Sequence, residues 1–196
     1  MKKILKKGLL ITLLLTSIIS FANENIISYK KSSTKKIKLE FGIVKKGHTL
    51  LILNKNGIVI SNLKIHSDGN YSKIFTFKGL ENGIYTAELY KDSVTIIKTL
   101  IIKDETVILL NESVKKIFTP TIRNQKDLVI ISKIHFDAKP ILIKIFYNKE
   151  VIFSEKLKRQ SDGVINRVYR LSKIEKGDYI IQVGADNRKY KKSFKL

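Results

Sequence analysis

The sequence contains no cysteine and no tryptophan, and it has only two prolines and one methionine. Without cysteine the chain has no disulfide framework, no thiolate-bound metal, no thiol nucleophile and no lipid anchor on an acylated cysteine. Acidic residues are also scarce, because 38 lysines and arginines face 17 aspartates and glutamates, which gives a net charge of +21. Hydrophobic residues nevertheless make up 43% of the chain, which favours a folded protein over a disordered one.

The first 22 residues have the three parts of a secretory signal. Lysines without acids precede Leu9, an apolar run covers Leu9–Ile19, and small residues stand at Ser20 and Ala22. The run is shorter than the roughly 20 apolar residues that span a bilayer. The pattern predicts a signal peptide over 1–22 with cleavage after Ala22, and an uncleaved anchor is the alternative. We therefore expect export across the inner membrane to the periplasm, the outer surface or the medium, with no transmembrane segment in the mature chain.

Most of the positive charge belongs to lysine, since the arginines are limited to Arg123, Arg159, Arg167, Arg170 and Arg188. Nucleic-acid sites favour arginine forks and stacking aromatic rings. The lysine excess therefore predicts a solvated basic surface and no nucleic-acid partner. Anionic glycans, lipopolysaccharide or acidic envelope proteins match such a surface.

Short motifs recur at a separation of 94 residues. Asn54-Lys55 returns as Asn148-Lys149, Ser67-Asp68-Gly69 as Ser161-Asp162-Gly163, and Gly83-x-Tyr85 as Gly177-x-Tyr179. Apolar residues match at the same offset, as in Leu51/Ile145 and Leu100/Phe194, without a gap from Leu51 to the C-terminus. The repeat predicts two homologous domains at 37–107 and 112–196, preceded by a flexible basic segment at 23–36 and joined by a short, semi-rigid connection.

Within each repeat, apolar residues alternate with polar ones. The alternation is clear in Ile37–Val44, Ile141–Tyr147 and Tyr190–Leu196, and turn signals such as Ala185-Asp186-Asn187 separate the runs. A period of two predicts strands with one apolar face. Short strands at regular spacing are typical of a β-sandwich, so the fold class is all-β, with two tandem immunoglobulin-like or fibronectin-III-like sandwiches after the signal peptide.

The C-terminal repeat resembles a known export domain. Lys149–Glu155, the Gly177-Asp178-Tyr179 strand and the basic, aromatic last strand Tyr190–Leu196 are similar to the C-terminal sorting domain of proteins exported by type IX secretion. Members of that family open their domain with a Pro-Asn-Pro-like segment, whereas this chain has only Thr119-Pro120-Thr121. The whole chain resembles small secreted proteins of the same bacteria that consist of two such sandwiches. The resemblance implies a fold and an envelope location, and no active site.

No residue constellation specifies a reaction or a cofactor. His48, His66 and His135 are not spaced as metal ligands, and Ser67, His66 and Asp68 are too close along one strand to form a catalytic triad. The Asp-Gly turns offer one carboxylate each, which suits a turn better than calcium. The tyrosines of the Gly-x-Tyr motifs are expected to pack inward, with their hydroxyls bonded to the backbone. We expect a protein that is not an enzyme and uses no metal.

One charged cluster is a candidate site for an anion or a protein partner. Its members are Lys156, Lys158, Arg159, Arg167, Arg170 and Lys173, on strands expected to be adjacent. The competing interpretation is that these charges protect strand edges from aggregation.

The sequence thus predicts a non-catalytic binding or structural module of the cell envelope. Possible partners are envelope proteins or an anionic glycan. Two alternatives have the same fold class: a fimbrial-type assembly chaperone, which works by strand addition, and a small cargo carried by a type IX sorting domain. A glycan hydrolase would need a carboxylate pair in a cleft, which the scattered acids do not suggest.

Overall fold

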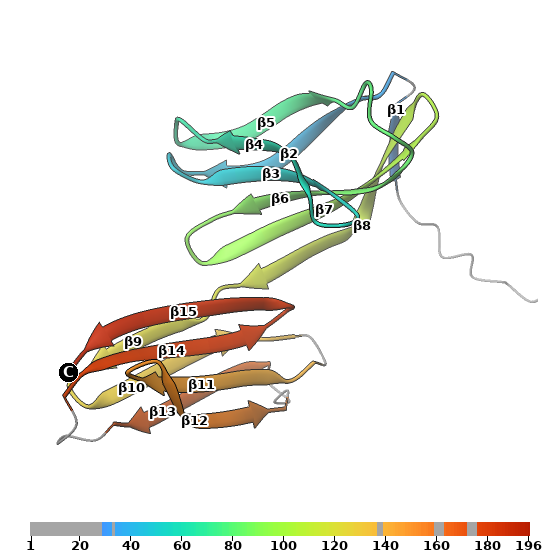
Figure 1. The fold of residues 1–196 in the computed structure, drawn as a ribbon. Coiled ribbons are helices and arrows are strands. Elements are labelled where there is room, and N and C mark those ends of the chain that lie inside the picture. The colour runs from blue at the N-terminus through green and yellow to red at the C-terminus, as the bar shows by residue number, and fades with distance from the viewer. Residues whose placement is uncertain (1–28, 33, 137–138, 159–162, 172–175) are drawn as a thin grey trace, which may run out of the picture.

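A computed structural model describes residues 29–32, 34–136, 139–158, 163–171 and 176–196, and these residues form strands without any helix (Figure 1). The predicted signal peptide, its cleavage site at Ala22, Arg159 and Lys173 lie outside the described residues. The first group of strands is β1 (Tyr29–Ser32), β2 (Lys36–Val44), β3 (Thr49–Asn54), β4 (Val59–Lys64), β5 (Gly69–Thr76), β6 (Gly83–Tyr90), β7 (Val94–Lys103) and β8 (Thr106–Phe118). The second group is β9 (Thr121–Gln125), β10 (Leu128–Ile134), β11 (Ile141–Tyr147), β12 (Glu150–Leu157), β13 (Val164–Arg170), β14 (Asp178–Ala185) and β15 (Arg188–Lys195).

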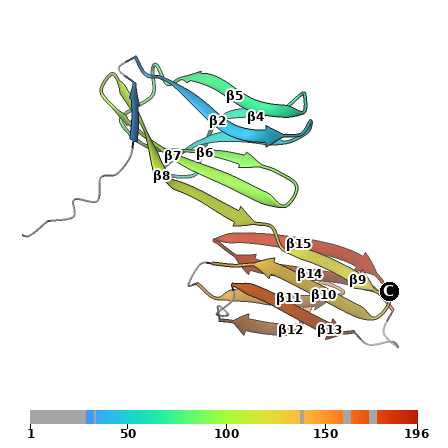
Figure 2. The same cartoon turned by 180° about the vertical axis from the view of Figure 1, so that it is seen from behind.

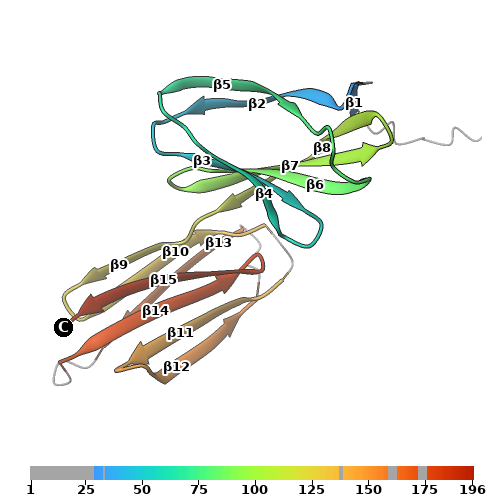
Figure 3. The ribbon, with the colours of Figure 1, turned by 45° about the horizontal axis from the view of Figure 1, so that its top comes forward.

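The strands pair antiparallel in four sheets that stack as layers. A six-stranded sheet with the order β1-β8-β7-β6-β3-β4 lies against the β2-β5 pair, as Figure 3 shows from above. A four-stranded sheet, β12-β11-β14-β15, lies against a three-stranded sheet, β13-β10-β9. The predicted all-β, sandwich-like fold is confirmed.

Each group of strands encloses its own hydrophobic cluster. Leu39, Leu50, Leu89 and Leu100 are completely buried in the first cluster. In the second, β14 buries alternate residues, among them Tyr179, Ile181 and Val183. The period of two seen in the sequence therefore sorts the side chains of each strand between a core and an outward face.

The two groups pair their strands in the same order. β3 lies between β4 and β6, and β6 pairs with β7, as β11 lies between β12 and β14, and β14 pairs with β15. The offset of 94 residues holds for the last pair, because Tyr85 is opposite Leu100 and Tyr179 is opposite Phe194. We call two residues equivalent when they lie opposite corresponding residues of the paired strands, one in each group.

The gapless alignment predicted from the sequence is wrong at β3. Ile52 is opposite Ala87 and Ile145 is opposite Ile181, so Ile52 is the equivalent of Ile145. Leu51, which the sequence matches to Ile145, lies on the outward face instead. The turn from β3 to β4 is longer than the turn from β11 to β12, and a one-residue slip exchanges the two faces of a strand.

Two predicted boundaries also differ from the structure. Residues 29–32, assigned to a flexible segment, form β1, which pairs with residues 107–110 of β8. β8 runs through the predicted gap between residues 107 and 112, and its end from Lys115 to Phe118 still pairs with β7. Figures 1 and 2 show β8 leading from the first group of strands toward the second. The connection is thus a continuous strand, held by backbone pairing that sequence composition does not reveal.

The described residues contain no helix that is both long and apolar enough to cross a membrane.

Candidate binding face

The predicted basic cluster is not a single patch. Lys156 lies on β12 and Lys158 follows it, whereas Arg167 and Arg170 lie on β13, which pairs with β10 in the other sheet. Arg167 and Arg170 are three residues apart and therefore point to opposite faces of β13. The expectation of adjacent strands on one face does not match this pairing.

An acidic side chain lies near each of these two arginines. The Arg167 Nε lies 3.6 Å from a Glu155 oxygen, and the Arg170 Nε lies 3.9 Å from Asp127. Glu155 also accepts a hydrogen bond from the Tyr169 hydroxyl, and burial together with this carboxylate raises the pKa of Tyr169 above its usual value. The Arg167–Glu155 pair therefore links β13 to β12 of the other sheet, whereas Arg170 stays exposed and pairs within its own sheet.

A different set of cations shares one face. The outward side of the four-stranded sheet is defined by side chains that alternate with the buried ones of β11 and β14. It carries Lys144, Lys156, Lys189, Lys191 and Lys195. One row across the sheet runs Ser154, Lys144, Gln182 and Lys191. We call these five lysines the lysine face.

The lysine face is accessible and nearly free of acids. Lys144 is half-buried and the other four lysines are exposed. Alternation places one described acid on this side, Asp178, opposite Lys195. Lys156 alone was singled out from the sequence. The lysines of β15 could have been found too, because Lys189, Lys191 and Lys195 follow the period of two in an edge strand.

Apolar residues and a hollow adjoin the lysines. Phe146 and Ile180 are opposite each other on the same side of the sheet and are half-buried. A depression of about 640 Å³ at this end of the sheet is lined by Asn148, Lys149, Asp178, Tyr179, Ile180, Ser193 and Phe194. The arrangement can therefore hold an anionic group on ammonium groups while a less polar part of the same ligand rests on Phe146 and Ile180.

Contacts of one charged side chain, Arg188, connect the two groups of strands. Arg188, the first residue of β15, donates hydrogen bonds to Glu88 at 2.6 Å and to the Thr95 hydroxyl at 3.0 Å, and it lies over the Tyr90 ring. Burial and the hydrogen bond to Glu88 raise the pKa of Tyr90 to about 12. These contacts join residues about 100 positions apart, which no local sequence pattern could reveal.

A second charged cluster lies next to the Arg188 contacts. The Lys133 Nζ lies 2.8 Å from Asp186 and also donates to the Phe118 carbonyl, and both charged side chains are almost fully buried. Asp186 and Asn187 both have positive φ in the two-residue turn between β14 and β15, a conformation that Asp and Asn tolerate better than most residues. The predicted turn is confirmed, and it holds Asp186 in position.

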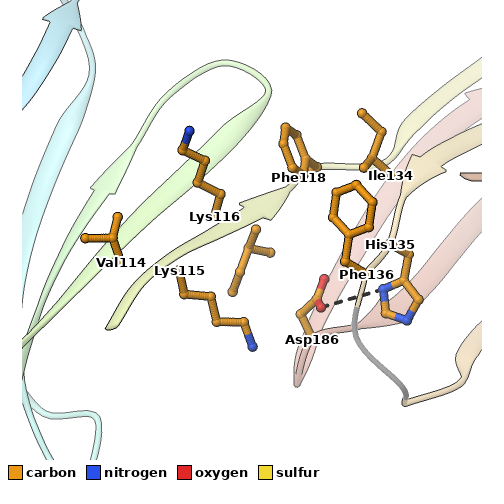
Figure 4. Close-up of a pocket in the computed structure, with 9 residues that line it drawn as sticks. Val114, Lys115, Lys116, Phe118, Ile134, His135, Phe136 and Asp186 are labelled. Atoms are coloured by element: carbon orange, nitrogen blue, oxygen red, sulfur yellow. Dashed lines mark ion pairs between the residues drawn. The ribbon is translucent and has the colours of Figure 1, made fainter. Parts of the chain in front are cut away.

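A pocket of about 440 Å³ separates β8 from the ends of β10 and β14 (Figure 4). His135 and Asp186 form one wall, with 3.7 Å between the His135 Nδ1 and an Asp186 oxygen. The Phe118 and Phe136 rings meet edge to face at 6.4 Å. The same figure shows Lys115 and Lys116 leaving β8 in opposite directions. The pocket is part of the junction between the two groups of strands.

The three histidines lie in separate places. His48 is buried near Asp92, His66 is exposed, and the Nε2 of His135 lies 2.7 Å from the Lys139 carbonyl. Among the described residues, no group of three or more His, Asp or Glu side chains could hold a metal ion.

The tyrosine of the first Gly-x-Tyr motif behaves as predicted. Tyr85 is buried, and its hydroxyl donates to the Glu81 carbonyl at 3.0 Å. Tyr179 packs inward as well, and its ring stacks with Phe194. Both motifs are therefore core features of the sandwich.

Fold and face together define an all-β protein of stacked antiparallel sheets with a basic outward surface. Compared with known proteins, the chain matches no family model, and no curated protein sequence is similar to it.

Proposed function

We propose that this protein is an exported, non-catalytic binding module of the cell envelope, and that its lysine face binds an anionic glycan. The proposal rests on one observation. Five lysines and a single described acid, Asp178, share one side of the four-stranded sheet. Lysine ammonium groups are hydrated point charges that suit flexible, repetitive anions better than a single planar carboxylate. Polymer binding of this kind depends on summed charge, so a broad face serves it better than a deep cleft.

Three carboxylates engaged in ion pairs support a non-catalytic role. Glu88 pairs with Arg188, Glu155 with Arg167, and Asp186 with Lys133. A carboxylate that serves as an acid or base in glycan cleavage faces the substrate, usually with a second carboxylate across the cleft. These three instead fasten strands to one another.

Binding of a sulfated glycan tests the proposal. Heparin fragments serve as the probe, and the double variant K191E/K195E reverses two charges on the exposed edge strand β15. We expect a large loss of affinity and a weaker dependence on salt, because fewer counterions are released on binding. K55E/K78E makes the same change in net charge at exposed positions of the first group and should bind much more tightly than K191E/K195E.

The result that contradicts the proposal is equal loss in the two double variants, since that would mean only the net charge matters. Far-ultraviolet circular dichroism of each variant shows whether the fold is intact. Cleavage products appearing when the probe is incubated with the protein would overturn the non-catalytic part.

The location is tested by fractionating the native cells and measuring the termini of the mature chain by mass spectrometry. We expect a chain that begins at Asn23 in the periplasm, on the outer surface or in the medium. Loss of the C-terminal strands from material in the medium would instead favour the alternative of a small cargo with a sorting domain. Retention of residues 1–22 would contradict signal cleavage.

A further inference from the structure

Apolar side chains form a row across the lysine face. Val151 on β12 lies opposite Phe146 on β11, and Phe146 lies opposite Ile180 on β14. Residues opposite each other on paired strands share one face of a sheet. Val151 is 51% exposed, while Phe146 and Ile180 are half-buried. Ser193 of β15, opposite Ile180, ends the row, so the outward side of the sheet offers an apolar row that runs across the strands.

Lysines border both long sides of this apolar row. On one side, Lys144 and Lys191 lie two residues before the members of the row on their strands. On the other side, Lys195 lies two residues after Ser193. Two residues of a strand cover about 7 Å, and two strand spacings separate the backbones of β11 and β15 by about 10 Å. The positive charges are therefore spread along the row instead of being concentrated at one point.

The spacing and the shape of this surface select one class of anion. A pyranose ring has apolar C–H faces that bury well against an aromatic side chain such as Phe146. In a polymer with a carboxylate on each sugar ring, a whole ring separates one charge from the next, which matches lysines spread along the row. Inorganic polyphosphate carries charge at every phosphorus and has no apolar face. Because the row is a single side chain wide, it offers little apolar area to an acyl chain.

The first sheet has a similar apolar row without the lysines. Leu53 is the equivalent of Phe146, and Val59 lies opposite Leu53 and is exposed. Where Lys144 flanks Phe146, Leu51 flanks Leu53. Apolar residues are therefore common to the outward sides of the two sheets, and their combination with lysines is particular to the second.

We propose that the lysine face binds a polyuronate, a polysaccharide with a carboxylate on each sugar ring, and that Phe146 is its specificity-determining residue. The sugar chain lies along the apolar row, across the strands. One ring rests on Phe146 with Val151 and Ile180 beside it, and the carboxylates of neighbouring rings reach the lysines on either side. This inference rests on the proposed function, because it names the class of anionic glycan for the same face.

Substitution of Phe146 tests the inference with two polyanions. Titration calorimetry compares oligogalacturonate, which has sugar rings, with inorganic polyphosphate, which has none. We expect F146A to weaken oligogalacturonate binding about three- to tenfold, as is usual for loss of an aromatic contact, and to leave polyphosphate binding unchanged. L53A, the matched variant in the first sheet, should leave both affinities unchanged.

A second variant covers the case in which F146A does not fold, which circular dichroism shows. F146L keeps most of the apolar area but lacks the flat ring, so we expect a smaller loss of oligogalacturonate affinity in the same direction. Unchanged oligogalacturonate affinity in the folded variants would overturn the inference. The proposed function would still stand in that case, because heparin binding and its loss in K191E/K195E are measured separately.

Three further results would also overturn the inference. Equal losses with both polyanions in F146A would mean that Phe146 only holds the lysines in place. A wild-type protein that binds heparin but not oligogalacturonate would require a different anionic glycan. Binding to phosphatidylglycerol vesicles that is lost in F146A would favour a membrane surface over a polysaccharide.

Discussion

The outward faces of the two large sheets differ at equivalent positions. Where the first sheet has Leu51 and Ile97, the second has Lys144 and Lys191, and Ile101 is replaced by Lys195. The inward positions are alike, because Leu89 and Val183 are both fully buried and apolar. A shared core preserves the fold, while the outward residues of the same strands carry different chemistry.

The turns after β6 and β14 form a second comparison. Asp92 and Asp186 are related by the 94-residue offset, and each lies near a histidine and a lysine. The Asp92 side chain is 74% exposed, however, while that of Asp186 is 7% exposed. The Asp186 side chain is buried at the junction between the groups, so its ion pair with Lys133 is internal, whereas the ion pairs of Asp92 lie at the surface.

The largest expected difference concerns these aspartates. D186N should destabilise the protein by about 3–5 kcal/mol, because the buried Lys133 loses the charge that compensates it. D92N should cost only about 0–1 kcal/mol, as is usual for exposed ion pairs. Asn tolerates positive φ as Asp does, so the Asp186 turn itself remains possible. Chemical denaturation of the two variants beside the wild type measures both values, and equal losses would contradict the comparison.

Neighbouring residues of β14 sharpen the contrast between core and face. Ile181 is fully buried, so I181A should cost about 2–5 kcal/mol through lost burial and a residual cavity. Gln182 lies on the outward face, so Q182A should change the free energy of unfolding by less than about 0.5 kcal/mol. Urea denaturation curves give both numbers. A loss for Q182A as large as that for I181A would mean that something else covers this face.

Transfer of lysines tests whether the outward chemistry alone decides anion binding. The variant L51K/I101K places lysines in the first sheet at the positions equivalent to Lys144 and Lys195. We expect tighter heparin binding and a salt dependence steeper by roughly one unit per added lysine. L51A/I101A removes the same apolar side chains without adding charge and should bind as the wild type does. No gain in the lysine variant would show that the second sheet contributes more than charge.

The smallest expected effect concerns alkaline pH. Because the pKa of Tyr90 is raised from 10.0 to about 12 in the folded protein, its contribution to stability is complete below pH 10 and is lost as the pH rises toward 12. The difference in free energy of unfolding between wild type and Y90F should therefore shrink across this range. Lysine titration affects both proteins alike and cancels in the comparison. A constant difference from pH 9 to pH 12 would contradict the assignment.

Local sequence patterns predicted which residues form strands better than they predicted which strands pair. The alternation in 37–44 and 141–147 predicted strands, and the Asp186-Asn187 turn was readable from residue type. The lysine face was missed apart from Lys156, because its members come from β11, β12 and β15 and only strand order brings them together. The cluster around Arg167 was predicted as one patch on adjacent strands, but β12 and β13 lie in different sheets.

The sequence by itself determined the all-β fold class, the faces of most strands and the common pattern of the two groups, since these depend on period-two burial and on turn chemistry close along the chain. Only the tertiary structure decided which outward residues lie side by side, how β3 is shifted against the repeat, and that Arg188 reaches Glu88. Those outcomes depend on which strands pair and on contacts between residues far apart in the chain, 100 positions in the case of Arg188 and Glu88. Patterns close along the sequence do not contain that information.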